Sequence, residues 1–190
     1  MVDFPGPKPS EMIIGGQTFV WGEKTYIMGV MNVTPDSFSG DGLNLDVDAA
    51  VRQAVQFQEW GAHILDVGGE STRPPSIYQD AGPVTSQQEL ERVIPAIEAI
   101  VQVVDLPVSV DTTKATVARE AIVAGAVMVN DQWALRADEG MLEVVSEAGV
   151  PLVLMHNQCD TEYRNLVPDV IESLRKSRDK AFRGGIDAVN

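Results

Sequence analysis

LPVSVDTTKATVAREAIVAGAVMVNDQ, residues 106–132, contains one complete repeat of the fold. It begins with a short apolar run without strict alternation, which is typical of strands buried on both faces of a parallel sheet. A helical pattern follows over 114–124 and stops at Gly125, a residue type that favours a left-handed helix end. A second apolar run begins directly after it. This order of strand, helix, glycine and strand predicts a right-handed βαβ unit.

The same unit recurs along the chain. Apolar runs cover 26–33, 63–69, 106–112, 126–132 and 150–157, and amphipathic patterns cover 46–60, 86–104, 114–124, 138–148 and 167–183. Glycines stand where the predicted helices end, at 61, 125, 149 and 184–185. The chain is therefore predicted to be an α/β protein with a parallel sheet.

Two local features refine this prediction. MIIGGQTFV and TYIM flank the turn-prone WGEK, which predicts a hairpin over 12–28. In the helix over 86–104, Ser86 and Glu89 have the spacing of a capping box. Pro95 lies inside the apolar stripe of this helix and predicts a kink or a late helix start.

Two architectures fit the repeat, an open doubly wound sheet and a (β/α)₈ barrel. The predicted strand ends are spaced by about thirty residues, as expected for one βα unit. Eight units need about 250 residues, and this sequence has 190. It ends with GGIDAVN (184–190), where a sixth strand is expected to begin.

Composition limits the classes of function. The content of 44% hydrophobic residues fits one globular domain over 1–190, and the net charge of −14 argues against binding to nucleic acid or an anionic membrane. The single Cys159 excludes an internal disulfide and suits a reducing compartment. No signal peptide or membrane anchor is visible, so a cytoplasmic location is expected.

Polar side chains end the predicted strands: Asn32, Asp66, Asp111, Asn130 and His156. In parallel α/β folds of either kind, ligands bind at the carboxyl ends of the strands. A helix cap or a turn explains any one of these residues alone. Five together at one edge favour a binding site.

The residue types indicate what this site binds. Arg73, beside Ser71 and Thr72, suits an anionic oxygen such as a phosphate, although a surface pair with Glu70 is the alternative. Asn32 offers a neutral oxygen that suits Mg²⁺ when phosphates and waters complete the coordination.

Two further strand ends indicate a heteroaromatic ligand. Asp111 can accept ring N–H groups and stabilise positive charge, and Asn130 can bond both donor and acceptor edges of a heterocycle. His156 and Cys159 are too few for a zinc site, so a loop thiol and a pocket-lining imidazole are expected instead. The basic residues of 167–183 are expected on a solvated face.

The motifs GVMNVTPDSFSGDG, LDVGGESTRP, SVDTTKATVAREAIVAGA, VND and LMHNQ occur in this order along nearly the whole chain. They resemble the successive strand-end motifs of dihydropteroate synthase. The resemblance implies a TIM (β/α)₈-type barrel and a transferase of folate biosynthesis. Such enzymes condense 6-hydroxymethyl-7,8-dihydropterin diphosphate with 4-aminobenzoate, releasing diphosphate and 7,8-dihydropteroate, and are commonly homodimers.

The resemblance also implies roles for residues in these motifs. Asn32 matches the family's Mg²⁺-associated asparagine, and Asp111 and Asn130 match its pterin-contacting pair. Asp111, which stabilises the charge developing on the pterin, and Arg73, which meets the leaving anion, are the expected catalytic residues.

The two long loops supply the remaining expected site residues. Thr72 and Arg73, with the hydroxyl of Ser71 beside them, match the residues that meet the substrate near the diphosphate and the aminobenzoate pocket. Phe38 and Pro74 match positions that frame 4-aminobenzoate, where sulfonamide drugs also bind. Residues 33–43 are expected to form a lid over diphosphate and Mg²⁺.

The sequence departs from the family at its end. The family's Asp-Pro-Gly, Ser-Arg-Lys and Arg-x-His segments do not occur, so about five βα units after the hairpin are expected, three short of a closed barrel. Such a chain is expected to be a fragment or to need a partner, and alone to be poorly soluble and weak in catalysis. Three alternatives stay open: a methyltetrahydrofolate-binding methyltransferase domain, a non-catalytic pterin-binding or interaction module, and a broken reading frame.

Overall fold

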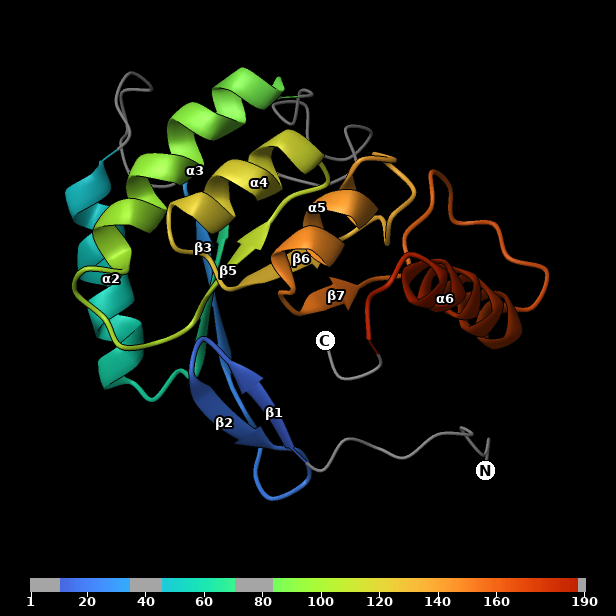
Figure 1. Ribbon diagram of the computed structural model, residues 1–190, viewed down its shortest axis with the longest axis horizontal. Helices are drawn as coiled ribbons and strands as arrows, with labels where there is room; N and C mark the ends of the chain where they lie inside the picture. The colour runs from blue at the N-terminus through green and yellow to red at the C-terminus, as the bar shows by residue number, and fades with distance from the viewer. Residues whose placement is uncertain (1–10, 35–45, 71–83, 188–190) are drawn as a thin grey trace.

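A hairpin precedes the main sheet in the computed structural model, which describes residues 11–34, 46–70 and 84–187 (Figure 1). Its strands are β1 (Glu11–Ile14) and β2 (Gln17–Val20). Gly15 and Gly16 form the turn with φ angles of 55° and 79°, a backbone conformation that glycine adopts without steric cost. The chain also turns at WGEK, where Gly22 has φ 94° and Trp21 forms a bridge with Lys24. The prediction that this turn joins the strands of the hairpin was wrong, because the two successive glycines form a two-residue hairpin turn earlier in the chain.

Five parallel strands form the main sheet in the order β3-β4-β5-β6-β7. They are β3 (Met28–Asn32), β4 (Ile64–Gly68), β5 (Val108–Asp111), β6 (Met128–Asp131) and β7 (Leu152–Leu154). Each strand pairs with the next one along the chain, whereas the order in a doubly wound sheet reverses once. The structure therefore decides for the barrel arrangement, which is incomplete over the residues described.

A helix follows each strand of this sheet. The helices are α2 (Val47–Glu59), α3 (Ser86–Ile100), α4 (Ala115–Val123), α5 (Met141–Ala148) and α6 (Leu166–Arg183). Helices α2 to α5 pack in succession along one face of the sheet, and α6 lies beyond β7 (Figure 1). The helices begin and end close to the predicted positions. Positive φ angles at Gly61, Gly125, Gly149 and Gly185 confirm the predicted left-handed ends, while Gly184 has φ −86°.

The start of α3 differs from the prediction by one residue. Thr85 caps the helix: its side chain accepts from the backbone N–H of Gln88, and the Gln88 side chain accepts from the backbone N–H of Thr85. The predicted box of Ser86 and Glu89 was wrong, because Thr85 holds the extended conformation of a cap and Glu89 is buried. The helix also continues through Pro95 and does not start late.

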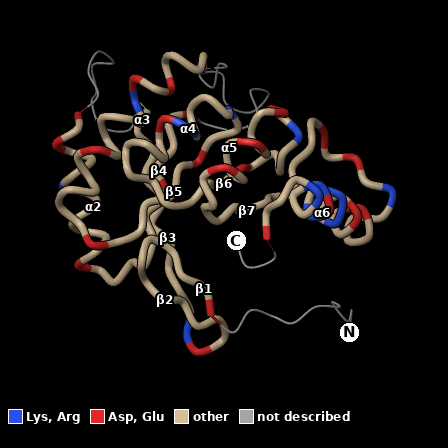
Figure 2. Tube along the Cα trace, in the orientation of Figure 1, with Lys and Arg blue, Asp and Glu red and all other residues tan. Residues whose placement is uncertain are grey.

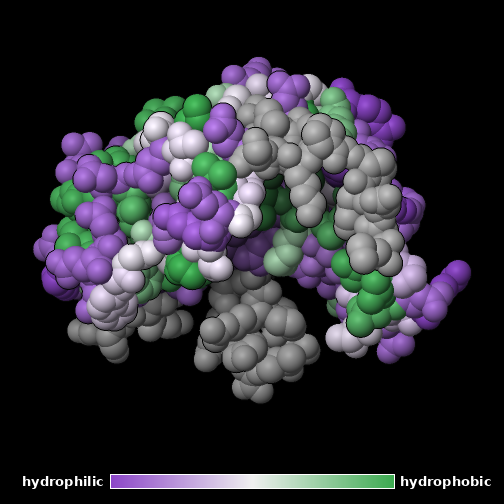
Figure 3. All heavy atoms as spheres, turned by 90° about the horizontal axis from the view of Figure 1, so that it is seen from below, coloured by the Kyte–Doolittle hydropathy of each residue, from purple (hydrophilic) through white to green (hydrophobic). Residues whose placement is uncertain are grey.

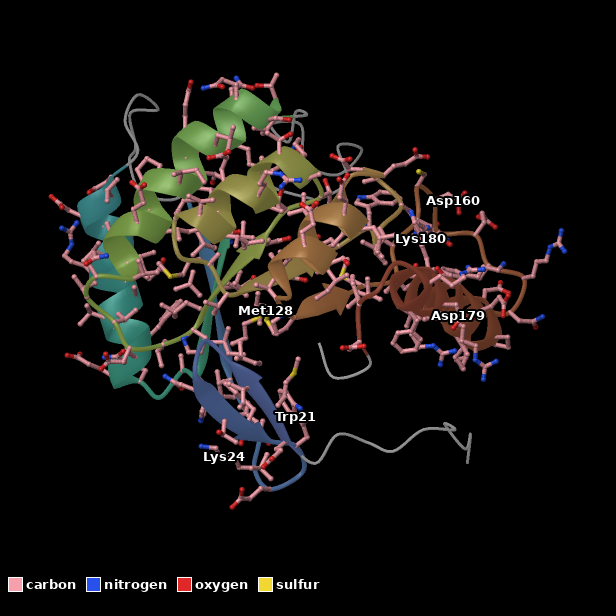
Figure 4. The ribbon with its side chains drawn as sticks, in the orientation of Figure 1. Trp21, Lys24, Met128, Asp160, Asp179 and Lys180 are labelled. Carbon is pink, nitrogen blue, oxygen red and sulfur yellow. The ribbon has the colours of Figure 1, made fainter. Side chains whose placement is uncertain are left out.

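Two apolar clusters stabilise the fold. The larger fills the space between the sheet and the helices and includes Val67, Ile97 and Val110. The smaller joins Ile14 and Phe19 of the hairpin to Ile64 and Met128, the first residues of β4 and β6. Figure 4 shows Met128 where the sheet meets the hairpin. The hairpin thus covers the amino ends of the strands and leaves the carboxyl ends to the loops.

The charged residues are unevenly distributed. Acidic side chains are spread over the molecule, whereas basic ones gather on α6 (Figure 2). Most of the basic side chains of this helix are exposed, as predicted for a solvated face, although Lys180 donates to the backbone oxygen of Leu135 at 2.5 Å. In the part of the chain that the structure describes, no helix combines the length and the apolar character needed to span a bilayer.

Strands β3 and β7 are the edges of the sheet within the described residues, as expected for a barrel three βα units short of closure. Val30 of β3 is 55% exposed although it shares a register level with the buried Asp66 of β4. An inward-facing valine becomes half exposed when no strand completes the wall opposite it. Figure 3 shows the face seen from below, where hydrophilic side chains dominate the margin and apolar ones reach the surface in several places.

Candidate active site

Four neighbouring strands bring residues at or next to their carboxyl ends to one level. Asn32 pairs with Gly68, Gly68 with Asp111, and Asp111 with Asn130. Side chains at paired positions of a parallel sheet point to the same face, and neighbouring strands are about 4.8 Å apart. The structure therefore gathers Asn32, Asp111 and Asn130 at one rim, as the sequence predicted for strand ends.

Glycine at position 68 leaves room for Asp111 at this level. A Cβ atom there would lie 3.3 Å from Cβ and 3.4 Å from Oδ2 of Asp111. Such a contact is tighter than ordinary van der Waals packing, so a side chain at this position would push the carboxylate aside. The close approach of Asp111 therefore explains why the first position of the GG pair in the LDVGGESTRP motif is a glycine.

Asp111 is a partly buried carboxylate with an unusual pKa. Burial raises its pKa, the negative charge of Asp66 raises it further, and the hydrogen bond from Gln132 Nε2 to Oδ2, 2.5 Å long, lowers it, leaving a pKa of about 7. The charges of Glu89 and Asp131 add smaller upward effects. Asp111 can therefore hold or release a proton near neutral pH, as carboxylates at active sites often do.

The side chain of Asn130 is hydrogen-bonded to Asp66, which lies closer to the amino ends of the strands. Its Nδ2 donates to Asp66 Oδ2 at 2.8 Å. Asp66 is only 3% exposed and lies two residues before the end of β4, paired with Ser109. The prediction that Asp66 ends its strand was wrong, because β4 continues to Gly68 and the rim position there belongs to glycine. Burial raises the pKa of Asp66, against the Ser109 hydroxyl and the Asn130 amide, which lower it.

A partly buried ionic cluster lies beside the rim. Lys114, just before α4, contacts the carboxylates of Glu70 and Glu89, the latter with an Nζ–Oε2 distance of 2.5 Å. Burial lowers the pKa of Lys114, but its hydrogen bonds and charge interactions with the two glutamates outweigh this effect and raise it. The other oxygen of Glu70 accepts from the backbone N–H of Val84 at 3.1 Å. The cluster therefore connects Glu70 and Val84, which flank 71–83, to the first turn of α3 and to the residue before α4.

Sequence reasoning missed Lys114 and Glu89 as partners. The signal was present, since Glu89 lies one helical turn before Val93 on the apolar stripe, where a charged residue needs a partner. Lys114, three residues after Asp111 in VDTTK, supplies that partner. Glu70 is already paired with Lys114, which leaves it less available for the surface pair considered for Arg73.

Asp131 follows Asn130 but serves the backbone. Its Oδ1 accepts from the N–H of Trp133 at 2.8 Å and its Oδ2 from that of Leu135 at 2.6 Å. Ala134 and Leu135 have positive φ angles of 53° and 65°, and these hydrogen bonds stabilise that left-handed turn. Asp131 is therefore engaged in shaping the loop after β6.

The prediction that His156 ends a strand was wrong, because β7 ends two residues earlier, at Leu154. His156 Nε2 lies 3.1 Å from the hydroxyl of Tyr163, and Cys159 is exposed with a free thiol. Within 11–34, 46–70 and 84–187, no group of three or more His, Cys, Asp and Glu side chains is placed to hold a metal ion. Asn32 remains an exposed single amide at the rim.

Five predicted site residues lie outside the described residues. They are Phe38, in 35–45, and Ser71, Thr72, Arg73 and Pro74, in 71–83. The predicted lid over 33–43 also falls largely there. Their positions relative to the rim stay predictions.

Comparison with known proteins identifies similar chains. The model of a family described as pterin binding enzyme matches residues 28–190. A dihydropteroate synthase of Clostridium beijerinckii is 45% identical over 179 residues, which cover 94% of this chain and 65% of that protein.

Solved structures agree with this result. The dihydropteroate synthase of Xanthomonas albilineans with 4-aminobenzoic acid superposes with a TM-score of 0.85 at 42% identity, covering 95% of this chain and 64% of that one. The enzyme of Yersinia pestis in a sulfonamide drug complex gives 0.81 at 36% identity, covering 93% and 64%. The chain thus spans somewhat less than two thirds of the length of these relatives.

Proposed function

Because the chain belongs to the pterin binding enzyme family, we propose that it acts as a dihydropteroate synthase or as the pterin-binding part of one. The observation that carries the proposal is the single rim level shared by Asn32, Asp111 and Asn130. The similarity to dihydropteroate synthases supports the same activity and favours it over the methyltransferase alternative.

The rim suits a flat heterocycle with N–H donors. The Oδ2 atom of Asp111 and the Nδ2 atom of Asn130 are engaged, while no hydrogen bond from the described residues reaches the Oδ1 atom of either. Two hydrogen-bond acceptors on neighbouring strands are thus available to a ligand at the rim. A pterin ring offers ring and amino N–H groups to such acceptors.

The proposed reaction places charge where Asp111 can respond. The C–O bond between the hydroxymethyl carbon and the diphosphate breaks, and diphosphate leaves with the bonding electrons. A C–N bond then forms to the amine of 4-aminobenzoate, which loses a proton. Positive charge develops on the pterin during this exchange, and the ionised carboxylate of Asp111 stabilises it from a fixed position.

Other features of the proposal rest on the resemblance. Asn32 has the chemistry of one Mg²⁺ ligand, a neutral exposed oxygen, and Mg²⁺ bound there would neutralise charge on diphosphate oxygens. Arg73 and Thr72 would meet the anion, with Ser71 beside them. Phe38 and Pro74 would frame 4-aminobenzoate, a pocket that sulfonamides would also occupy. A homodimer of the full-length protein and a cytoplasmic location belong to the same proposal.

The test measures binding and turnover separately. Calorimetric titration with 6-hydroxymethyl-7,8-dihydropterin diphosphate should give saturable binding, which Asp111→Asn weakens about 10- to 100-fold, because a hydrogen bond to a charged group is lost. Asp179→Asn on α6 removes an exposed carboxylate that pairs with Arg178 and should leave affinity unchanged (Figure 4). Release of diphosphate only when 4-aminobenzoate is added would establish the synthase activity.

A second candidate function is pterin binding without turnover. The observation that favours it is the pair of acceptors on Asp111 and Asn130 at the rim, which can bind a ring without a second substrate. Saturable binding with no release of diphosphate would support this module. Absence of binding would contradict both candidates.

A further inference from the structure

Asp66 is buried in the site without meeting its mouth. It lies one register level below the rim, on the same face as Asp111 and Asn130, and is 3% exposed. Its Oδ1 atom and the hydroxyl of the neighbouring Ser109 are both buried without a hydrogen bond of ordinary geometry from the described residues. A carboxylate is costly to bury when its oxygens lack hydrogen-bond donors, so the one well-formed hydrogen bond that Asp66 accepts needs an explanation.

That contact is the hydrogen bond from Asn130 Nδ2 to Asp66 Oδ2, 2.8 Å long. It crosses strand β5 and joins β4 to β6, residues far apart in the sequence. An asparagine amide has a donor end and an acceptor end of nearly equal size, and packing alone distinguishes them poorly. An ionised carboxylate only accepts hydrogen bonds, so it selects the orientation with Nδ2 toward it.

The orientation of this amide decides what the rim offers to a ligand. With Nδ2 turned toward Asp66, Oδ1 is the end left for a ligand, beside the Oδ1 atom of Asp111 at the paired position. The rim then presents acceptors on two neighbouring strands. If the amide turned over, a donor would stand beside the carboxylate of Asp111 and one ligand N–H group would lose its partner.

We propose that Asp66 is a positioning residue, which fixes the amide of Asn130 so that the site presents paired acceptors and selects heterocycles with neighbouring N–H donors. The inference rests on the proposed function only for the nature of the ligand. Asp66 acts through Asn130 and does not itself touch the ring.

A double-mutant cycle tests whether Asp66 acts through Asn130. Affinity for 6-hydroxymethylpterin is measured by calorimetry for the wild type, Asp66→Ala, Asn130→Ala and the double variant. Asp66→Ala should weaken binding about tenfold, the loss expected for one misdirected hydrogen bond. In the Asn130→Ala background the same substitution should change affinity less than about twofold, because its partner is already absent.

Two matched variants separate positioning from general damage to the fold. Asp66→Asn keeps the size of the side chain but offers Asn130 both a donor and an acceptor, so it no longer selects the orientation and should weaken binding nearly as much as Asp66→Ala. Ser109→Ala removes a buried polar group at the same level and leaves the bond between Asp66 and Asn130, so this variant should bind normally. Equal and additive losses in both backgrounds, or wild-type affinity in Asp66→Asn, would overturn the proposal.

A measurement without ligand makes the outcome independent of the proposed function. In NMR spectra of the wild type, one side-chain amide proton of Asn130 should exchange slowly with solvent, because it is hydrogen-bonded to a buried carboxylate. Asp66→Ala should abolish this protection and Ser109→Ala should keep it. Protection that survives Asp66→Ala would refute the positioning role. Normal protection without pterin binding would instead refute the proposed function alone.

Discussion

Replacement of Lys114 by methionine should destabilise the protein strongly. Its ammonium is shared by Glu70 and Glu89, whose side chains are 23% and 1% exposed. Methionine fills similar space but leaves the Glu89 carboxylate buried without a cation. Removing one partner of a buried ion pair costs about 3–5 kcal/mol.

Urea unfolding followed by far-UV circular dichroism measures this loss. Arg119→Ala is the control, because it removes an ion pair with Glu147 of 3.2 Å whose side chains are 51% and 58% exposed. Such an exposed pair contributes about 0–1 kcal/mol. The double variant Lys114→Met with Glu89→Gln should recover much of the lost stability, because no buried charge remains unpaired. If Lys114→Met costs no more than Arg119→Ala, the reasoning about this cluster is wrong.

Three further predictions concern the rim and α3. Because burial and the charge of Asp66 raise the pKa of Asp111 to about 7, the native state holds a proton that the unfolded chain releases above about pH 4. The free energy of unfolding should therefore fall as pH rises from about 4 to about 7, and urea titrations of Asp111→Asn should show a smaller fall. Thr85→Ala should cost about 1 kcal/mol in the same assay, whereas Ser86→Ala should cost less than half of that, since Thr85 provides the cap. Gly68→Ala should weaken pterin binding in calorimetry, because its Cβ would displace the Asp111 carboxylate; unchanged affinity would contradict that contact.

The repeat of buried strands and amphipathic helices was predictable because it depends on local patterns. The inner strands β4, β5 and β6 are almost wholly buried, as apolar runs in a parallel sheet are, and four of the five helices described are followed by a glycine of positive φ. The rim followed from the same repeat, since the carboxyl ends of parallel strands meet at one edge. Asn32, Asp111 and Asn130 accordingly share a level.

The features that the sequence did not predict depend on contacts between distant segments or on one residue of register. Asp66 lies below the rim because β4 extends two residues further, to Gly68. Glu89 has a plausible local role in a capping box, yet its partner Lys114 comes from another βα unit. The turn between the hairpin strands was assigned to WGEK because that segment and the pair Gly15 and Gly16 lie close together and are both turn-prone.

A crystal structure of the chain with 6-hydroxymethyl-7,8-dihydropterin diphosphate tests the central claim most directly. We expect the ring to lie against the carboxyl ends of β5 and β6, with its N–H groups within hydrogen-bond distance of Oδ1 of Asp111 and Oδ1 of Asn130. A ring bound elsewhere, or an empty rim at saturating ligand, would contradict the account.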